Sequence, residues 1–376
     1  MQRLPERSMH KSMERIRVNL EKSVKDSYDI IIGEDVIDRV GLTAKVKGEI
    51  DRYVIVTDSD VNPLYGQRVL ERLKETTRPV DIIEIPAGES SKSLETVDGV
   101  ARRLVGLSAS RKSLLIALGG GVVGDVAGFV ASIYMRSIPY IQIPTTLLAQ
   151  VDSSVGGKTG VDLPEGKNLV GTFYQPKAVY IDLSVLETLS DKDFGNGLAE
   201  IIKYSIIADH GFFELLEQEK AGIRKRDISL MKNLVGRSCK IKAEIVEKDE
   251  KESDLRRILN FGHTLGHALE AGSDYSLSHG EAVAIGMVGA AMISHKLNHL
   301  DENSCARIAA LIESYGLPTT IPAGMETAKI TGFMTTDKKA VGGQLHFVLT
   351  KGIGVPFVTP EVPPGVVVEA IEELKR

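Results

Sequence analysis

The sequence contains little cysteine and no long apolar run. Its 376 residues include only Cys239 and Cys305, too few for a disulfide scaffold or a cysteine-rich zinc site, and the two form no Cys-x-x-Cys redox pair. The longest apolar stretch, 282–293, is well short of the ~20 residues that a bilayer span needs. Residues 1–17 are charged and lack the apolar core of an export signal. We therefore expect a cytoplasmic protein without a membrane partner.

Neither sign of charge dominates. The chain has 46 Lys and Arg against 51 Asp and Glu, a formal net charge of −5, and 43% of its residues are hydrophobic. This balance is typical of a globular protein and excludes a disordered charged tail, and a mildly acidic chain is a poor nucleic-acid binder. At about 150 residues per domain, the length predicts two or three domains.

The first half of the chain alternates short apolar runs with longer amphipathic segments. The apolar runs predict strands at 53–56, 81–85, 113–118, 140–143 and 179–181. Helix-length segments such as 63–74 and 93–106 lie between them. This alternation favours an α/β fold with a mostly parallel sheet and helices on its faces.

The pattern changes near residue 184, where helical periodicity replaces the strands. Helices are predicted within 198–208, 228–248, 256–271, 280–295 and 304–315, followed by a β-rich pair at 345–350 and 352–358. We therefore expect a Rossmann-like sheet domain over 1–184 and a mainly α-helical metal- and substrate-binding domain over 185–376.

A glycine loop follows the predicted strand at 113–118. It reads Gly-Gly-Gly-Val-Val-Gly-Asp over 119–125 and leads into an apolar helix. A strand, a glycine turn and a helix start form a phosphate site, because backbone N–H groups and the positive helix end hold an anion there. The loop departs from Gly-x-Gly-x-x-Gly and lacks the Gly-Lys-Ser/Thr of a P-loop, which disfavours ATP hydrolysis. The alternative is a tight turn that needs glycine only for positive φ.

Two upstream segments favour a dinucleotide over a simple turn. Asp58 closes one predicted strand, where its carboxylate can bind a ribose hydroxyl, and Glu89 and Lys92 follow the next strand. Each segment alone is typical of turns and helix caps. Together they indicate a dinucleotide lying across the strand ends.

The second half carries a candidate metal centre. His263 and His267 lie one helical turn apart, and His279 opens the next predicted helix after a serine. Glu200 sits in an otherwise apolar helix with Lys203 at i+3, a costly arrangement unless the acid is paired or bound to metal. Two histidines and a carboxylate suit Zn²⁺ or a similar Lewis acid, whereas histidine caps and a buried ion pair are the alternative. No His-Glu-x-x-His is present, so that type of metalloprotease is not expected.

Cations flank these segments. A polar, glycine-rich stretch covers 144–160 and 166–168, and the cations near it or near the metal candidates are Lys158, Lys167, Lys203, Lys242 and Arg256. Any one of them alone would be read as a solvated surface charge. Their grouping beside glycine loops is what a phosphorylated, carboxylated substrate requires.

These motifs together resemble the 3-dehydroquinate synthase family over about 53–350. The matching segments are 119–125, 144–158, 166–176, Glu200 with Lys203, and 260–267 with His279. The resemblance implies a lyase of the shikimate pathway, which leads to chorismate and aromatic amino acids. It would convert 3-deoxy-D-arabino-heptulosonate 7-phosphate, a phosphorylated sugar acid, to 3-dehydroquinate and phosphate. The implied steps are transient oxidation by NAD, phosphate elimination, re-reduction and intramolecular aldol closure, with one divalent metal, zinc or cobalt.

The resemblance also assigns roles to residues. The metal ligands would be Glu200, His263 and His279. The catalytic residues would be Lys158, Asn168, Lys203, Arg256, Asn260 and His267. NAD would be contacted by Asp58, Glu89, Lys92, Gly120, Gly121, Asp125, Thr145, Thr146, Asp152, Lys158, Lys167, Leu186, Glu187 and Thr188. The substrate would be contacted by Asp152, Lys158, Lys167, Asn168, Lys203, Lys242, Arg256, Asn260, His267 and either Lys338 or, as taken here, Lys339.

One implied contact crosses between subunits. In relatives, the residue at Arg136 reaches the substrate phosphate of a neighbouring subunit, which implies a homodimer. The chain departs from some relatives at Asp60, where they carry Asn, and this weakens only a contact on the ribose side.

Three other functions share part of these motifs. Metal-dependent polyol and glycerol-phosphate dehydrogenases have a similar glycine loop and histidine pair, but a small alcohol does not require the cationic block at 152–158 and 166–168. Other sugar-phosphate cyclases keep most of the motifs. A non-catalytic NAD-binding protein would keep the glycine loop without needing the metal set.

Overall fold

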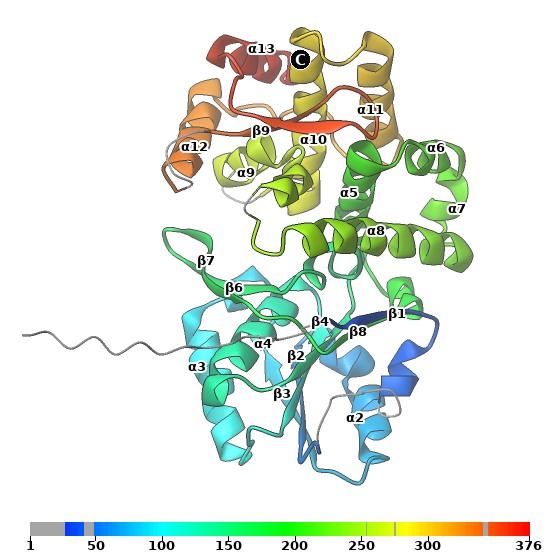
Figure 1. The fold of residues 1–376 in the computed structure, drawn as a ribbon, viewed down its shortest axis with the longest axis vertical. Coiled ribbons are helices and arrows are strands. Elements are labelled where there is room, and N and C mark those ends of the chain that lie inside the picture. Colours follow the sequence, from blue (N-terminus) through cyan, green and yellow to red (C-terminus); the bar gives the residue numbers. More distant parts are fainter. Residues whose placement is uncertain (1–26, 41–48, 253, 274–275, 341–344) are drawn as a thin grey trace, which may run out of the picture.

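The computed structural model describes residues 27–40, 49–252, 254–273, 276–340 and 345–376, with the backbone alone for 335–340. The prediction about the charged segment at 1–17 lies outside these residues. The described chain forms a sheet half and a helical half, stacked along the long axis of the molecule (Figure 1). None of the helices in the described ranges combines the length and apolar character needed to cross a membrane.

The sheet half is built on six parallel strands. In the spatial order β3-β2-β4-β5-β8-β1, they are β3 (Val80–Ile85), β2 (Tyr53–Asp58), β4 (Leu114–Gly119), β5 (Tyr140–Pro144), β8 (Ala178–Asp182) and β1 (Asp29–Gly33). The central strands are near-continuous apolar runs because helices cover both faces of a parallel sheet.

Alternate side chains of the strands pack on opposite faces. Val54 and Val56 join a core cluster with α3 (Leu94–Gly106) and α4 (Gly121–Ile133). Ile55, on the same strand, packs with α2 (Gln67–Lys74) and the 3₁₀ turn η1 (Val36–Arg39) instead. The period of two along β2 therefore gives the sheet its two helical layers.

The helical half surrounds α10 (His279–Lys296), whose residues are mostly buried. The other helices are α5 (Asp191–Ala208), α6 (His210–Gln218), α7 (Lys220–Arg224), α8 (Ile228–Lys248), α9 (His263–Gly272), α11 (Glu302–Ser314), α12 (Thr327–Ala340) and α13 (Pro364–Leu374). An antiparallel pair, β9 (Phe347–Thr350) and β10 (Pro356–Thr359), packs beside them. One apolar core runs from Leu147 and Val179 of the sheet half into this half.

The structure confirms the α/β class, the parallel sheet and all five strands predicted from sequence. The helix expected over 256–271 is interrupted: a 3₁₀ segment, η7 (Leu255–Asn260), ends before α9 begins. Sequence analysis missed β1 and also the antiparallel hairpin of β6 (Lys158–Leu163) and β7 (Gly166–Phe173), which lies at the junction of the halves (Figure 1).

Candidate active site between the halves

The glycine loop lies at the point where the strand order reverses. From β2 the chain passes to β3 on one side and then returns to β4 on the other. Asp58 ends β2 and Gly119 ends β4, so both lie at the carboxyl edge beside this reversal. Ligands of open α/β sheets bind in the crevice at such a point. The predicted cofactor residues at the two strand ends are thus neighbours.

The three glycines serve close packing, not positive φ. Gly120 has φ −73°, and none of Gly119, Gly120 and Gly121 lies in the left-handed region. A Cβ on Gly119 would lie 2.6 Å from the Val123 side chain, and one on Gly120 would lie 3.1 Å from Thr146. The alternative of a turn that needs glycine for its φ is therefore wrong. The loop brings its backbone close to neighbouring segments at the start of α4, where N–H groups are available to an anion.

The buried Lys92 forms an ion pair with the partly buried Asp125 beside this loop, with Nζ 2.6 Å from Oδ2. Burial alone would lower the pKa of Lys92, but the Asp125 carboxylate raises it above its usual value, so the lysine stays charged. Thr145, at the end of β5, has a buried hydroxyl that bonds to none of the described residues. A polar ligand placed here would satisfy that hydroxyl.

The remaining predicted cofactor residues lie around the same edge. Asp58 Oδ1 accepts the backbone N–H groups of Asp60 and Val61 at 3.0 and 2.8 Å, which fixes the turn after β2. The segment Leu183–Glu187 follows β8, and Thr188 at its end pairs with the Tyr65 hydroxyl at 2.6 Å. Thr146 Oγ1 accepts the N–H of Ala149 at 3.1 Å.

Glycines set the positions of the three metal candidates by letting their helices approach closely. Gly262, with φ 80°, precedes α9, and a Cβ there would lie 2.7 Å from the Met287 backbone of α10. A Cβ on Gly286 would lie 2.0 Å from the carbonyl oxygen of Gly262, and one on Gly280 would lie 2.4 Å from Asn196 Cα of α5. The start of α9 therefore lies against the middle of α10, and the start of α10 lies against the first half of α5.

Glu200, His263 and His279 come together at this contact, with one ligand atom from each within 4.8 Å of the others. Glu200 Oε1 lies 3.6 Å from His263 Nε2 and 3.5 Å from His279 Nε2. This oxygen is fully buried and makes no hydrogen bond to any residue in the described ranges. A divalent cation would satisfy it, and the two imidazole nitrogens are suitable further ligands. The donor set therefore fits a metal.

The electrostatics of this group depend on its burial. Burial opposes the charge of Glu200, but Lys203, whose ammonium pairs with Oε2, and His279 lower its pKa to about 2. Burial lowers the pKa of His263 to about 3, so its ring is neutral. Its Nδ1 lies 3.2 Å from the carbonyl oxygen of Phe261, which leaves Nε2 facing Glu200. The predicted Glu200–Lys203 ion pair therefore coexists with a carboxylate oxygen available to metal.

His267 stays close to the group but outside it. Its ring lies edge-on to that of His263 at 5.3 Å between centroids and 6.3 Å from that of His279. Its ring is also more exposed than that of either candidate ligand. Its role in substrate binding stays a prediction.

A second polar cluster joins the sheet half to the helices. The Asp152 carboxylate accepts hydrogen bonds from Lys242 Nζ at 2.7 Å and from the Tyr204 hydroxyl. Burial opposes its ionisation, but Lys242 and Lys203 lower the pKa of Asp152. Burial raises the pKa of Tyr204, which therefore stays protonated and donates. Asp152 and Lys242 were predicted, whereas Tyr204 was missed because it reads as one more apolar position of α5.

Glu252 links two further predicted residues. It pairs with the Lys158 ammonium and accepts a hydrogen bond from Asn260 Nδ2 at 2.9 Å. Arg256 is buried, and its guanidinium donates to the carbonyl oxygens of Gly156 and Glu250. Arg256 therefore holds the backbone of the loop after Asp152. Glu252 was not predicted, because it lies in a charged segment without a motif.

Lys167, on the hairpin of β6 and β7, connects the predicted cofactor and metal groups. Its Nζ lies 3.9 Å from Glu89 and 3.4 Å from Glu270 Oε1. Glu270 Oε2 in turn lies 3.5 Å from Nδ1 of His279. One lysine therefore spans from the cofactor side of the sheet to the metal group, so the two groups border one another.

Two predicted residues are not brought into this cluster of described side chains. Arg136 is exposed on a strained turn after α4, where Met135, Arg136 and Ser137 all have positive φ. Asn168 has φ 57° and an exposed side chain on the hairpin, and its backbone N–H donates to Asp162 Oδ1 at 2.6 Å. Lys339 lies in the last turn of α12, and its side chain is outside the described residues.

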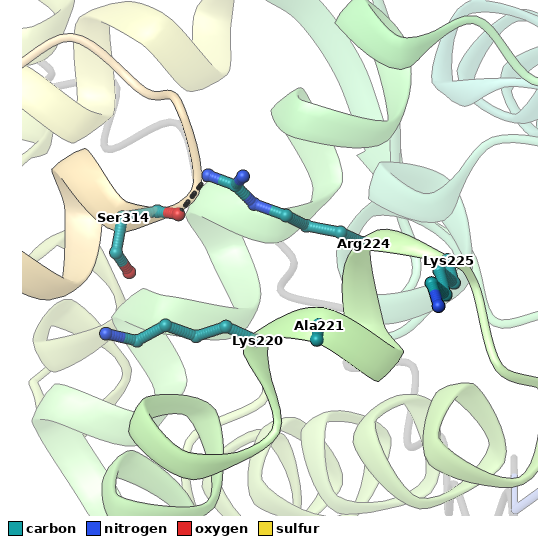
Figure 2. A pocket seen from close by; sticks show the side chains of 5 residues that line it. All are labelled: Lys220, Ala221, Arg224, Lys225 and Ser314. Carbon is teal, nitrogen blue, oxygen red and sulfur yellow. Dashed lines mark hydrogen bonds between the residues drawn. The ribbon is translucent and has the colours of Figure 1, made fainter.

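A basic surface hollow lies elsewhere in the helical half. Figure 2 shows it lined by Lys220, Ala221, Arg224, Lys225 and Ser314, with the Arg224 guanidinium donating to the Ser314 carbonyl. The hollow includes none of the residues predicted for the active site.

Comparison with known sequences gives matches to one family, 3-dehydroquinate synthase. A family model described as 3-dehydroquinate synthase N-terminal matches residues 82–196, and one described as 3-dehydroquinate synthase C-terminal matches residues 197–340. The 3-dehydroquinate synthase of Acidithiobacillus ferrooxidans is 48% identical over 349 residues, which cover 92% of this chain and 95% of that protein. That of Caulobacter vibrioides is 46% identical, with 89% and 93% covered.

Solved structures give the same architecture. The 2-epi-5-epi-valiolone synthase of Streptomyces hygroscopicus, solved with NAD⁺ and Zn²⁺, matches with a TM-score of 0.87 and 30% identity over 96% of this chain and 99% of that one. A 2-deoxy-scyllo-inosose synthase, complexed with carbaglucose-6-phosphate, NAD⁺ and Co²⁺, matches with a TM-score of 0.83 and 28% identity over 92% and 96%. A butanol dehydrogenase of Thermotoga maritima, at 16% identity and a TM-score of 0.68 over 93% and 97%, shares the fold alone.

Proposed function

The chain belongs to the 3-dehydroquinate synthase family, and from this premise we propose how its residues carry out the reaction of that family. It is a lyase that converts 3-deoxy-D-arabino-heptulosonate 7-phosphate to 3-dehydroquinate and phosphate. Its cofactors are NAD and one divalent metal, Zn²⁺ or Co²⁺. The observation that carries the structural part of the proposal is the buried, unbonded Glu200 Oε1, which faces the Nε2 atoms of His263 and His279.

Glu200, His263 and His279 would hold the metal. When bound, the metal supplies a Lewis acid that polarises neighbouring oxygens of the substrate. Three protein ligands leave coordination positions open for those oxygens. Lys203 neutralises the second oxygen of Glu200, which keeps that carboxylate ionised in a buried position.

The crevice at the ends of β2 and β4 would hold NAD. When bound, NAD supplies a hydride acceptor and then returns the hydride, so that no net oxidation occurs. Gly120 and Gly121 would present backbone N–H groups to the pyrophosphate, and Thr145 would gain a partner for its buried hydroxyl. Asp58, Glu89 and the turn 186–188 lie at the same edge of the sheet and would contact the ribose and base sides.

The cations between the halves would bind the substrate. Lys158 and Lys167 lie on the hairpin, whereas Lys242 and Arg256 lie on α8 and η7 of the helical half. Each is held by a carboxylate or by backbone carbonyls. We assign them to the carboxylate and phosphate of the sugar acid, since charge-assisted bonds orient such groups. Asn168, Asn260 and His267 would donate or accept hydrogen bonds at the reacting ring, which favours the aldol closure by proximity.

The proposal extends to a homodimer in the cytoplasm. Exposed Ile133 and Met135 flank the strained turn that carries Arg136. An apolar surface beside a strained, exposed arginine suits a partner contact in which Arg136 reaches the phosphate in the neighbouring site. We also propose Lys339 as a substrate contact. The two proposed domains, 1–184 and 185–376, would lie on either side of the site.

The test is incubation of metal-loaded protein with the heptulosonate phosphate and catalytic NAD⁺, followed by assay of phosphate and 3-dehydroquinate. Lys203→Ala and His279→Ala should each abolish phosphate release, and Lys240→Ala, an exposed lysine on α8, is the matched control. Chelator treatment should remove activity, and Zn²⁺ or Co²⁺ should restore it. Full turnover by either site variant contradicts the assignment.

The same assay separates the other functions. A polyol dehydrogenase would accumulate NADH in proportion to its product, whereas this enzyme should show none beyond the amount of bound cofactor. Another sugar-phosphate cyclase would release phosphate from a heptose or hexose phosphate that lacks the carboxylate. A non-catalytic NAD-binding protein would bind the cofactor with full affinity after metal removal and release no phosphate.

A further inference from the structure

Glu270 lies next to the metal group but has no role among the assignments above. It sits near the end of α9 and is buried, with 5% of its surface exposed. Its two carboxylate oxygens face different partners. Oε1 lies 3.4 Å from Lys167 Nζ, and Oε2 lies 3.5 Å from His279 Nδ1.

The geometry around His279 repeats that around His263. Each ring has Nε2 directed toward Glu200 Oε1, at 3.5 and 3.6 Å. Each ring also has an oxygen acceptor at Nδ1: Glu270 for His279 and the carbonyl of Phe261, at 3.2 Å, for His263. An imidazole that donates from one nitrogen presents the lone pair of the other, so an acceptor at Nδ1 fixes Nε2 as the metal-binding atom.

We propose that Glu270 is a positioning residue, which orients His279 toward the metal through Nδ1 and holds Lys167 beside the same ring. The inference rests on the proposed metal group of Glu200, His263 and His279. It goes beyond that group because it assigns the choice of coordinating nitrogen to a fourth side chain. Since Lys167 lies on the hairpin of β6 and β7, the same carboxylate also ties that hairpin to the helical half.

The same residues offer a competing arrangement. One ligand atom each from His267, Glu270 and His279 also lie within 4.8 Å of one another, which is compatible with a second cation. Two features oppose it. The Lys167 ammonium lies against Glu270 and repels a further dication, and Nδ1 of His279 cannot donate to Glu270 and bind a metal together. The observations therefore favour orientation of one metal ligand over a second metal site.

The test uses the full-length, metal-free protein titrated with Co²⁺, whose visible absorption reports ligand geometry. Glu270→Gln keeps an acceptor oxygen but loses the charge, and Glu270→Ala loses both. We expect Co²⁺ to bind about 10-fold more weakly to the first variant and about 100-fold more weakly to the second, with an altered absorption band. Glu247→Gln, an exposed residue of α8 with the same change of charge, should bind as the unaltered protein does.

Unchanged affinity and an unchanged band in both Glu270 variants would overturn the inference. A stoichiometry of two bound Co²⁺ ions per unaltered chain, falling to one in Glu270→Ala, would also overturn it, because it would establish the second metal site instead. His279→Ala distinguishes failure of the proposed function: if that variant binds Co²⁺ as tightly as the unaltered protein, the metal group itself is wrong. Dependence on His279 without dependence on Glu270 refutes only the positioning role.

A second measurement needs no variant. In the zinc-loaded protein labelled with ¹⁵N-histidine, His279 should show a protonated Nδ1 and a metal-shifted Nε2. Metal bound through Nδ1 would refute the inference whether or not the Glu270 variants fold.

Discussion

The close approach of α10 to α5 can be tested with one methyl group. A Cβ on Gly280 would lie 2.4 Å from Asn196 Cα and 2.9 Å from its carbonyl oxygen, and these are backbone atoms that cannot rotate away. To restore a contact of 3.4 Å, the two helices must part by about 1 Å. Gly280 follows His279 directly, so Gly280→Ala should move that ligand away from Glu200.

The expected magnitudes follow from this displacement. Overpacking costs about 1–3 kcal/mol and alanine gains about 0.5–1 kcal/mol in a helix, so the metal-free variant should lose up to about 2.5 kcal/mol of unfolding free energy. Metal sites tolerate changes of about 0.2 Å in ligand distance, so we expect zinc affinity to fall at least about 100-fold. At a zinc concentration 100 times the Kd of the unaltered protein, the stabilisation by zinc should drop from about 2.7 to about 0.4 kcal/mol.

Urea unfolding with and without zinc measures both quantities. Gly236→Ala is the matched control, because Gly236 lies within α8 and a Cβ there has no neighbour within 4 Å. It should gain up to about 1 kcal/mol and leave the response to zinc unchanged. If Gly280→Ala keeps the full stabilisation by zinc, the close approach of α5 and α10 does not position His279 and the reasoning is refuted.

Two further perturbations probe charges in the helical half. Lys203→Met leaves Glu200 buried without its cation, and we expect the metal-free protein to lose about 3–5 kcal/mol in urea unfolding; a loss below 1 kcal/mol would show that the ion pair does not stabilise this core. Asp209 is the N-cap of α6, where its carboxylate accepts the N–H of Phe212 at 3.0 Å and pairs with Arg237 at 2.5 Å. Burial opposes the charge of this carboxylate, but Arg237 and the backbone N–H lower its pKa. Because the folded-state pKa lies below the unfolded value of about 3.9, the carboxylate should stabilise the fold above about pH 4 and lose that effect as pH falls through the folded pKa. Asp209→Asn keeps the cap and removes the charge, so its unfolding free energy should differ from that of the unaltered protein at pH 6 and converge at acid pH; a difference constant with pH would contradict the assignment.

The sheet was predictable because its signal is local. Each central strand is a mostly apolar segment of five or six residues followed by turn residues, and burial on both faces makes the apolar character nearly continuous. The hairpin of β6 and β7 gave no such signal. Its residues are polar, glycine-rich and largely exposed on β7, and its two strands pair only with each other. Pairing of this kind depends on register, which a polar, glycine-rich segment specifies weakly.

The site was predictable where residue type and spacing are unusual together. His263 and His267 at i and i+4, and an acid with a lysine in the apolar α5, are such cases. Glu252, Glu270 and Tyr204 were missed for the opposite reason: each is ordinary in its segment, and each has a partner in a distant part of the chain, namely Lys158, Lys167 and Asp152. Tyr204 meets Asp152 across 52 positions, a separation at which periodicity gives no information.

Glycine explains why the metal ligands were easier to name than to place. The sequence shows three histidines and a glutamate on three helices, but ligand atoms within 4.8 Å require those helices to approach more closely than side chains usually permit. Gly262, Gly280 and Gly286 remove the methyl groups that would prevent it. A glycine in a helix otherwise weakens it by about 1 kcal/mol, so Gly280 and Gly286, both within α10, exchange helix stability for proximity of α10 to α5 and α9. The metal group is therefore encoded as much by the small residues beside its ligands as by the ligands themselves.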